Sequence, residues 1–261
     1  MGELYQEPAR ARSYWAKVNY YDSGAVEVTA CHIPVNRQPF EGVRIVCGKP
    51  ERIARDRTAE VVAQDRARAA ARARSTVRRL CMTMGADRLL TCTFRRNETS
   101  ASAAWSCWRR FVRLVRERMP GWRYVVVAER QQRGAFHFHA AVRGYQAVRT
   151  LRECWLEAAG DGNIDVTPPR RGVRAVEASG HVARYLAKYL AKAFEDSALG
   201  SHRYRASEAL KVPVVRFWLD AERWPDAVNE ALSLAAGDNG RELRAVYFGD
   251  EWSCVWGVGW S

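Results

Sequence analysis

The sequence predicts an α+β fold whose central sheet is mostly antiparallel and is flanked by helices. Two observations lead to this fold class. Segments with strand and helix periodicity follow one another in the order strand, helix, strand, strand, helix, strand, helix. The two middle strands are separated only by the short turn sequence QQRG, so they are expected to form an antiparallel hairpin. N- and C-terminal extensions complete the chain.

The elements of this central region follow from composition and spacing. Four segments rich in β-branched and aromatic residues are predicted strands: 88–96, 122–130, 135–144 and 163–167. Three segments with apolar residues at helical spacing are predicted helices: 102–118, 147–158 and 180–194. The stretch 172–179 fits either a further strand or a loop.

Composition divides the chain into four segments. We expect an N-terminal arm or small strands at 1–50, an Arg- and Ala-rich helix at 51–84, the α+β core at 85–196, and a C-terminal accessory segment at 197–261 that packs on the core. The basic helix is either a solvated surface helix or lies along a phosphate backbone, with Arg78 and Arg79 as contacts. The basic, aromatic stretch HRYRAS contacts DNA or is a surface loop.

The charge of the chain favours a polyanionic partner. The formal net charge is +13, and 48% of the residues are hydrophobic, which is enough for a sizeable core. A basic protein without a special ligand remains the alternative. The seven cysteines are odd in number and none are spaced as CxxC, so neither a disulfide framework nor a zinc ribbon is expected. Reduced thiols, no signal peptide and no long apolar run fit a cytoplasmic protein without a membrane partner.

The tract AFHFHAAV places two histidines on one side of a strand. Because alternate side chains share a face, His137 and His139 project together, and Phe136, Phe138 and Ala140 project to the other face, where they can seal the core. The imidazoles would lie about 7 Å apart along the strand. Such a pair can bind a divalent metal, or can be ordinary polar surface.

Hairpin symmetry suggests a third ligand. If the pairing is symmetric about residue 133, near the turn at Gly134, then Glu129 lies across from His137. Two imidazoles and a carboxylate on one face would leave coordination positions open for water and phosphate oxygens.

The segment HVARYLAKYLAKAF repeats with a four-residue step. Tyr185 and Tyr189 therefore share one helix face, and Lys188 and Lys192 form a second pair beside them. A tyrosine can be a covalent nucleophile when its surroundings favour the phenolate, and a lysine can stabilise charge on the phosphate that it attacks. Alone, the segment also fits an amphipathic helix with solvated lysines.

Together these tracts resemble the three motifs of the HUH endonuclease superfamily, specifically the two-tyrosine rolling-circle replication initiators of plasmids and single-stranded DNA phages. LLTCTFR at 89–95 resembles the first motif, with Cys92 where a leucine is usual. FHFH at 136–139 and YLAKYLAK at 185–192 resemble the second and third. The resemblance covers about residues 86–194 and implies an HUH core on an RRM-like palm.

The resemblance also implies an activity and its residues. His137, His139 and Glu129 would bind Mg²⁺ or Mn²⁺. Tyr185 and Tyr189 would cut single-stranded DNA at an origin and stay attached to its 5′ phosphate. Lys188 and Lys192 match the lysines that follow the tyrosines. Contacts to DNA are expected from the following side chains: Thr91, Thr93, Arg95, Arg133, Arg78 and Arg79. A host helicase and DNA polymerase in a bacterial cytoplasm would act with the protein, since no Walker A motif is present.

Two other readings remain open. One is a different HUH member, a relaxase or a transposase, although relaxases carry their tyrosine ahead of the histidines. The other is a non-catalytic single-strand binder on an RRM-like sheet, which needs aromatic side chains exposed on the sheet. Exposed Phe136 and Phe138 would favour the binder.

Overall fold

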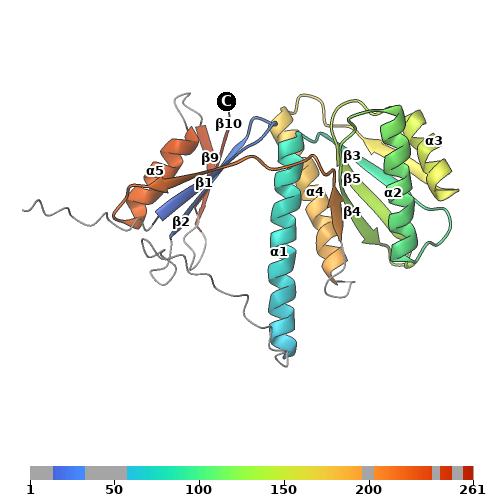
Figure 1. Cartoon of the computed structure of the whole chain (residues 1–261), viewed down its shortest axis with the longest axis horizontal. Coiled ribbons are helices and arrows are strands. Elements are labelled where there is room, and N and C mark those ends of the chain that lie inside the picture. Colours follow the sequence, from blue (N-terminus) through green and yellow to red (C-terminus); the bar gives the residue numbers. More distant parts are fainter. Residues whose placement is uncertain (1–13, 33–57, 196–202, 237–241, 249–254, 261) are drawn as a thin grey trace, which may run out of the picture. The chain divides into compact units, whose positions relative to one another are not determined.

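The computed structural model describes residues 14–32, 58–195, 203–236, 242–248 and 255–260 (Figure 1). The chain forms two compact units. The larger unit consists of residues 57–212 with 21–23, and the smaller unit combines the remaining N-terminal residues with 213–261. Within the described residues, no helix is both long enough and apolar enough to cross a membrane.

A five-stranded sheet lies at the centre of the larger unit. Its strands are β3 (Arg88–Thr93), β4 (Val125–Arg130), β5 (Phe136–Val142), β6 (Asn163–Thr167) and β7 (Tyr204–Ala206). They are ordered β6-β3-β5-β4-β7, and each neighbouring pair is antiparallel. The predicted α+β class with an antiparallel central sheet is confirmed, and the β4–β5 hairpin lies within that sheet.

Helices α2 (Ala101–Arg118) and α3 (Val148–Ala159) pack on one face of this sheet (Figure 1). The Ser100 side chain caps the start of α2 by accepting a hydrogen bond from the Ala103 amide. The core on this face is aromatic: the ring centroids of Phe138 and Trp108 lie 5.1 Å apart, and Trp155 is also fully buried. Rings of this size bury much apolar area, so they hold this face of β5 against the helices.

Helices α1 (Ala59–Met84) and α4 (Ala175–Glu195) pack together on the opposite side. Val77 of α1, Leu186 of α4 and Val127 of β4 belong to one buried cluster. This packing brings the tyrosine-bearing helix to the sheet face that does not carry Phe138.

The start of α4 differs from the sequence prediction. Residues 172–179 were expected to be a strand or a loop before a helix at 180–194, whereas α4 already begins at Ala175. Gly180 weakens the local helix signal, because glycine is a poor helix former. Val176 and Ala178 are nevertheless buried, and this packing stabilises the extra turn.

Strand β7 is a second difference, because the sequence predicts no strand in HRYRAS, which is interpreted as a DNA contact or a surface loop. Residues 204–206 instead pair with β4, with Tyr204 opposite Val127. The pairing depends on backbone hydrogen bonds to a strand almost 80 residues away, and three residues are too few to give a periodic pattern.

The smaller unit is a second antiparallel sheet with one helix. Its elements are β1 (Tyr14–Tyr20), β2 (Val26–His32), β8 (Val214–Leu219), α5 (Trp224–Ala236), β9 (Glu242–Phe248) and β10 (Val255–Trp260). The strand order is β8-β1-β2-β10-β9. Val18, Val28 and Ala227 lie in its buried core.

This arrangement differs from the expected division of the chain. The predicted arm at 1–50 contributes strands to the same sheet as the predicted accessory segment at 197–261, and that sheet belongs to a unit of its own. The predicted helix at 51–84 is in the same unit as the core. Composition cannot reveal that the two ends of a chain share a sheet, because strand pairing joins segments distant in sequence.

Candidate active site

The histidine pair of β5 lies on the sheet face that α4 covers. Phe138, between the two histidines, is fully buried on the opposite face, as strand alternation predicted. Phe136 is half-buried and packs against the same cluster. The binder reading required exposed phenylalanines on the sheet, so these two rings do not support it.

Glu129 of β4 pairs with His137 of β5 in the sheet register, so the predicted hairpin register is confirmed. The carboxylate, however, contacts the diagonal neighbour: its Oε2 lies 2.8 Å from Nε2 of His139. Only 8% of Glu129 is exposed. A buried carboxylate needs such a partner, because removing a charge from water is costly.

Lys192 of α4 supplies the second partner of Glu129. Its Nζ donates to Oε1 at 2.9 Å, so both carboxylate oxygens have a partner. Burial acts to raise the pKa of Glu129, but the hydrogen bonds from Lys192 and His139 outweigh it and hold that pKa below its usual value. Glu129 is therefore ionised at neutral pH.

His139 is held between the sheet and α4. Its Nδ1 lies 3.3 Å from Oγ1 of Thr91, and its ring stacks on that of Tyr189 with centroids 3.7 Å apart at 13°. Burial lowers the pKa of His139 although Glu129 opposes this effect. The contacts at both nitrogens and on one face fix the orientation of the ring, and burial favours its neutral form.

His137 is the less constrained histidine. Its Nε2 is buried and has no hydrogen-bond partner in the part of the chain that the structure describes. Burial is also the main cause that lowers its pKa. A neutral imidazole with an unsatisfied buried nitrogen can form a hydrogen bond with a ligand or coordinate a metal ion.

The donor set suits a divalent metal, but its present arrangement is an ion pair. Two neutral imidazoles and one ionised carboxylate are ligands that such metals accept, and Nε2 of His137 lacks a partner. Among the described residues, no three His, Cys, Asp or Glu side chains are grouped closely enough to hold a metal. Binding by all three residues would require the Glu129 carboxylate to exchange one of its present hydrogen bonds.

The two tyrosines of α4 differ in exposure and in hydrogen bonding. Tyr189 donates from its hydroxyl to the Tyr185 oxygen at 2.8 Å, and Tyr185 is 45% exposed. Burial, and next the hydrogen bond to Tyr185, raise the pKa of Tyr189. The more accessible phenol, Tyr185, therefore accepts the hydrogen bond that the less accessible Tyr189 donates.

The structure places the remaining predicted residues outside this cluster. Lys188 is exposed one turn before Lys192. Thr93 lies beside His137 in the register, and its hydroxyl donates to the Asn163 carbonyl. Arg78 and Arg79 are half-buried on α1.

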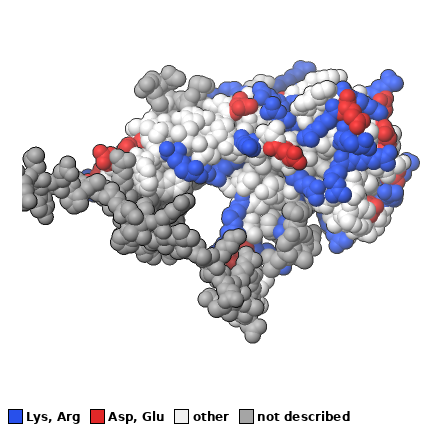
Figure 2. All heavy atoms as spheres, viewed as in Figure 1, with Lys and Arg blue, Asp and Glu red and all other residues white. Residues whose placement is uncertain are grey.

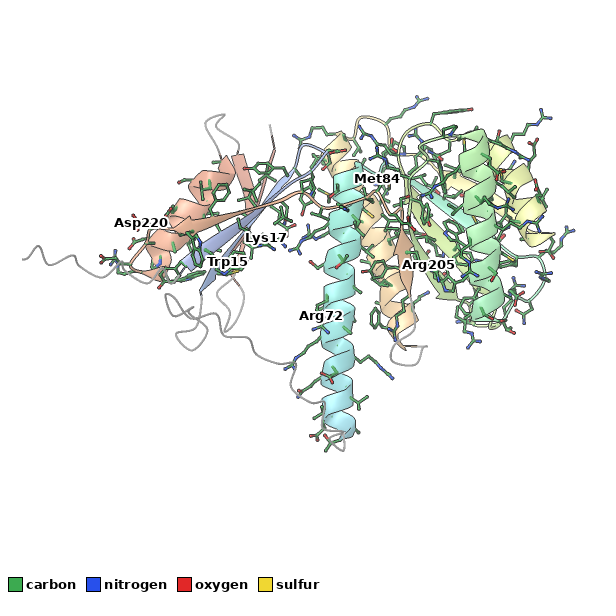
Figure 3. The ribbon with its side chains drawn as sticks, in the orientation of Figure 1. Trp15, Lys17, Arg72, Met84, Arg205 and Asp220 are labelled. Atoms are coloured by element: carbon green, nitrogen blue, oxygen red, sulfur yellow. The ribbon has the colours of Figure 1, made fainter. Side chains whose placement is uncertain are left out.

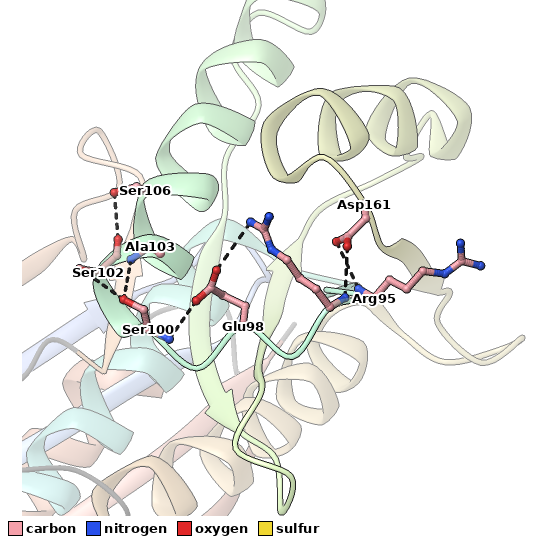
Figure 4. A network of polar contacts seen from close by, with 8 residues as sticks. Arg95, Glu98, Ser100, Ser102, Ala103, Ser106 and Asp161 are labelled. Carbon is pink, nitrogen blue, oxygen red and sulfur yellow. Dashed lines mark hydrogen bonds and ion pairs between the residues drawn. The ribbon is translucent and has the colours of Figure 1, made fainter.

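Arg95 and Arg133 lie in exposed turns at the end of the sheet. The Asp161 carboxylate accepts hydrogen bonds from the backbone amides of Arg95 and Arg96, which leaves the Arg95 side chain directed to solvent (Figure 4). Arg133 Nη2 donates to the Phe94 carbonyl. Sequence reasoning did not single out Asp161, although its position between two glycines, in GDG, is a turn signal that could have identified it.

The fold and the site thus define an α+β protein with a His-Glu-Lys cluster on an antiparallel sheet, under a helix that carries two tyrosines. Residues 87–194 match the family model described as "Replication-associated protein ORF2/G2P". Searches of the curated proteins and of the solved structures found no match. The matched segment includes every residue of the cluster, and it supports a replication-associated, Rep-like protein that interacts with DNA.

Proposed function

We propose that this protein is a replication initiator endonuclease that cuts and rejoins single-stranded DNA through a covalent 5′-phosphotyrosine. The observation that carries the proposal is the stacking of Tyr189 on His139 at 3.7 Å. It brings the tyrosine pair of α4 to the sheet face of His137, His139 and Glu129. A helix on the other face of the sheet would have separated the nucleophiles from this cluster.

Tyr185 is the better candidate for the first cut. It is the more exposed phenol, and its oxygen, which would attack, accepts the hydrogen bond from Tyr189. Its Oη would attack the phosphorus while the bond from phosphorus to O3′ breaks. One phosphodiester replaces another, and the proton lost from Tyr185 balances the proton that the 3′ oxygen gains. The resulting 3′-OH would serve a host polymerase, with a host helicase opening the duplex.

Mg²⁺ or Mn²⁺ is the proposed cofactor, held by His137, His139 and Glu129. Bound there, it would polarise the scissile phosphate and orient it. The chain's own part is to keep both imidazoles neutral by burial and to position the Glu129 carboxylate through Lys192. Lys192 also lies 5.7 Å from the centre of the Tyr189 ring, where its charge can stabilise a nearby phosphate.

A labelling experiment tests this function. The full chain is incubated with a pool of single-stranded oligonucleotides that carry an internal label, with Mn²⁺ or with EDTA, and protein-bound label is measured after denaturing electrophoresis. We expect an adduct with Mn²⁺ that EDTA abolishes. The Tyr185→Phe variant should lose most of it, and the Tyr185→Phe, Tyr189→Phe double variant all of it. An undiminished adduct in the double variant would overturn the proposal.

A further inference from the structure

A groove at the edge of the larger sheet is lined by arginines that the candidate active site does not use. It has a volume of about 770 Å³ and lies where β7 meets α2 and the end of α4. Its charged lining consists of Arg109, Arg116, Arg203, Arg205 and Glu208. Lys and Arg side chains cover much of the face of this unit that Figure 2 shows, so charge alone does not distinguish the groove. The contacts of these arginines distinguish the groove from the rest of this surface.

Three of the arginines interact with neutral groups. Arg109 donates to the Ser106 hydroxyl at 2.8 Å, and Arg116 to the Ser207 hydroxyl at 3.3 Å. Arg205, labelled in Figure 3, lies 4.7 Å from the centre of the Trp105 ring. Within the described chain, none of the three forms an ion pair with an acidic side chain, and Glu208 forms none either.

The other end of the groove adds more positive charge in a partly buried setting. Arg203 lies 4.0 Å from the centre of the Phe194 ring, and burial and the nearby Arg66 both lower its pKa. Nε of Arg66 is buried and has no hydrogen-bond partner among the described residues. Guanidinium groups that lie close together repel one another, and a bound anion relieves that repulsion.

Two backbone contacts connect this groove to the candidate active site. Nε of Arg203 donates to the carbonyl of Ala193, which follows Lys192. The Arg203 carbonyl accepts from the amide of Ala128, which precedes Glu129. One end of the groove is thus next to both residues of the Lys192–Glu129 ion pair.

We propose that this groove binds the phosphates of a single DNA strand where it passes the candidate active site. The planar guanidinium group fits a phosphate in two-point contact, and arginine is the residue that favours such recognition. Arg109 and Arg116 are two helical turns apart on α2, about 10 Å, so more than one phosphate can be contacted. The choice of a single strand rests on the proposed function, because the adjoining site is proposed to cut single strands.

Binding is measured by fluorescence anisotropy with the full chain, a labelled single-stranded oligonucleotide of mixed sequence, and EDTA present throughout. The groove variant is Arg109→Gln, Arg205→Gln. The matched control is Arg118→Gln, Arg149→Gln, which removes the same charge from arginines outside the groove that are paired with Glu157 and Glu153 of α3. We expect the groove variant to bind about 10-fold more weakly. Its slope of log affinity against log salt should fall by about 1.4, since each phosphate contact to a single strand contributes about 0.7.

The control should change affinity by less than about 2-fold, because its arginines are paired with carboxylates of α3 and do not line the groove. Arg109→Gln alone should lower the salt slope by about 0.7. Because Arg109 is exposed, this single variant is expected to fold and tests the groove even if the double variant does not. Equal binding of the single-stranded oligonucleotide by the groove variant and the control would overturn the proposal. Because no metal is present, the result is independent of adduct formation: a missing adduct with groove-dependent binding contradicts only the proposed function.

Discussion

Glu129 is a buried carboxylate that depends on two neighbours, His139 in the sheet and Lys192 on α4. The first contact joins the two strands of the β4–β5 hairpin, and the second joins β4 to a residue 63 positions further along the chain. The tract YLAKYLAK does not indicate which of its two lysines, Lys188 or Lys192, contacts Glu129. Both lysines follow a tyrosine by three positions, yet only Lys192 reaches the carboxylate, and Lys188 is exposed.

We expect Lys192→Met to lower the free energy of unfolding by about 1 kcal/mol, because it leaves Glu129 with one partner. The estimate is kept low since half of the Lys192 side chain is exposed and water screens the pair. Lys188→Met is the control and should change stability by less than about 0.5 kcal/mol. Urea unfolding measures both. Equal effects of the two substitutions would contradict the role assigned to Lys192.

The two histidines make stability depend on pH. Burial lowers the pKa of His137 and of His139 in the folded state, so the unfolded chain binds more protons once the pH falls below about 6.5. Stability from these groups is present above that pH and is lost on acidification toward the lowered folded values. The lowered pKa of Glu129 instead matters only below its ordinary value of 4.5.

We therefore expect the protein in EDTA to be less stable at pH 5 than at pH 7. The loss should be smaller in His137→Gln, because one of the two titrating groups is gone. Urea unfolding of wild type and variant at both pH values gives the difference. A pH-dependent loss as large in the variant as in wild type would show that His137 does not contribute.

At the scale of elements, a tight turn positions β6 beside β3. Gly162 has φ +110, and a Cβ there would collide with the Thr93 carbonyl, whose oxygen also accepts a hydrogen bond from the Trp155 indole at 3.0 Å. Gly160 has φ +81 with open space around it. Both glycines are needed for their backbone angles, but only Gly162 is also needed for space.

Gly162→Ala should destabilise the protein by more than about 2 kcal/mol, and Gly160→Ala by about 1 kcal/mol, the ordinary cost of a left-handed backbone. Thermal unfolding compares the two variants. If the two substitutions lower stability equally, the close approach of β3 does not restrict the residue at position 162.

At the scale of the whole molecule, every residue of the candidate site and of the arginine groove belongs to the larger unit. That unit has a core on each face of its sheet, one around Phe138 and one around Leu186. The smaller unit has its own core around Val18 and Val28. Separate cores are what allow parts of a chain to fold independently.

A fragment of residues 57–212 should therefore unfold in one cooperative transition, and it should form the DNA adduct if the full chain does. Circular dichroism during heating and the labelling experiment described above provide the two measurements. A fragment without a cooperative transition would show that the larger unit needs the remaining residues to fold.

The sequence by itself determined the local geometry of this protein. Alternation along β5 placed the histidines opposite Phe138, hairpin symmetry paired Glu129 with His137, and a four-residue step put Tyr185 and Tyr189 on one helix face. These results follow from short-range periodicity, which the sequence displays directly.

Only the tertiary structure decided which of these faces meet. The stacking of Tyr189 on His139, the choice of Lys192 over Lys188, and the position of β7 beside β4 all depend on how α4 packs against the sheet. The pairing of strands from the two ends of the chain in one sheet is likewise visible only in the tertiary structure. Such contacts join residues that are many tens of positions apart, and burial of their apolar faces, which has no direction of its own, selects among the possible packings.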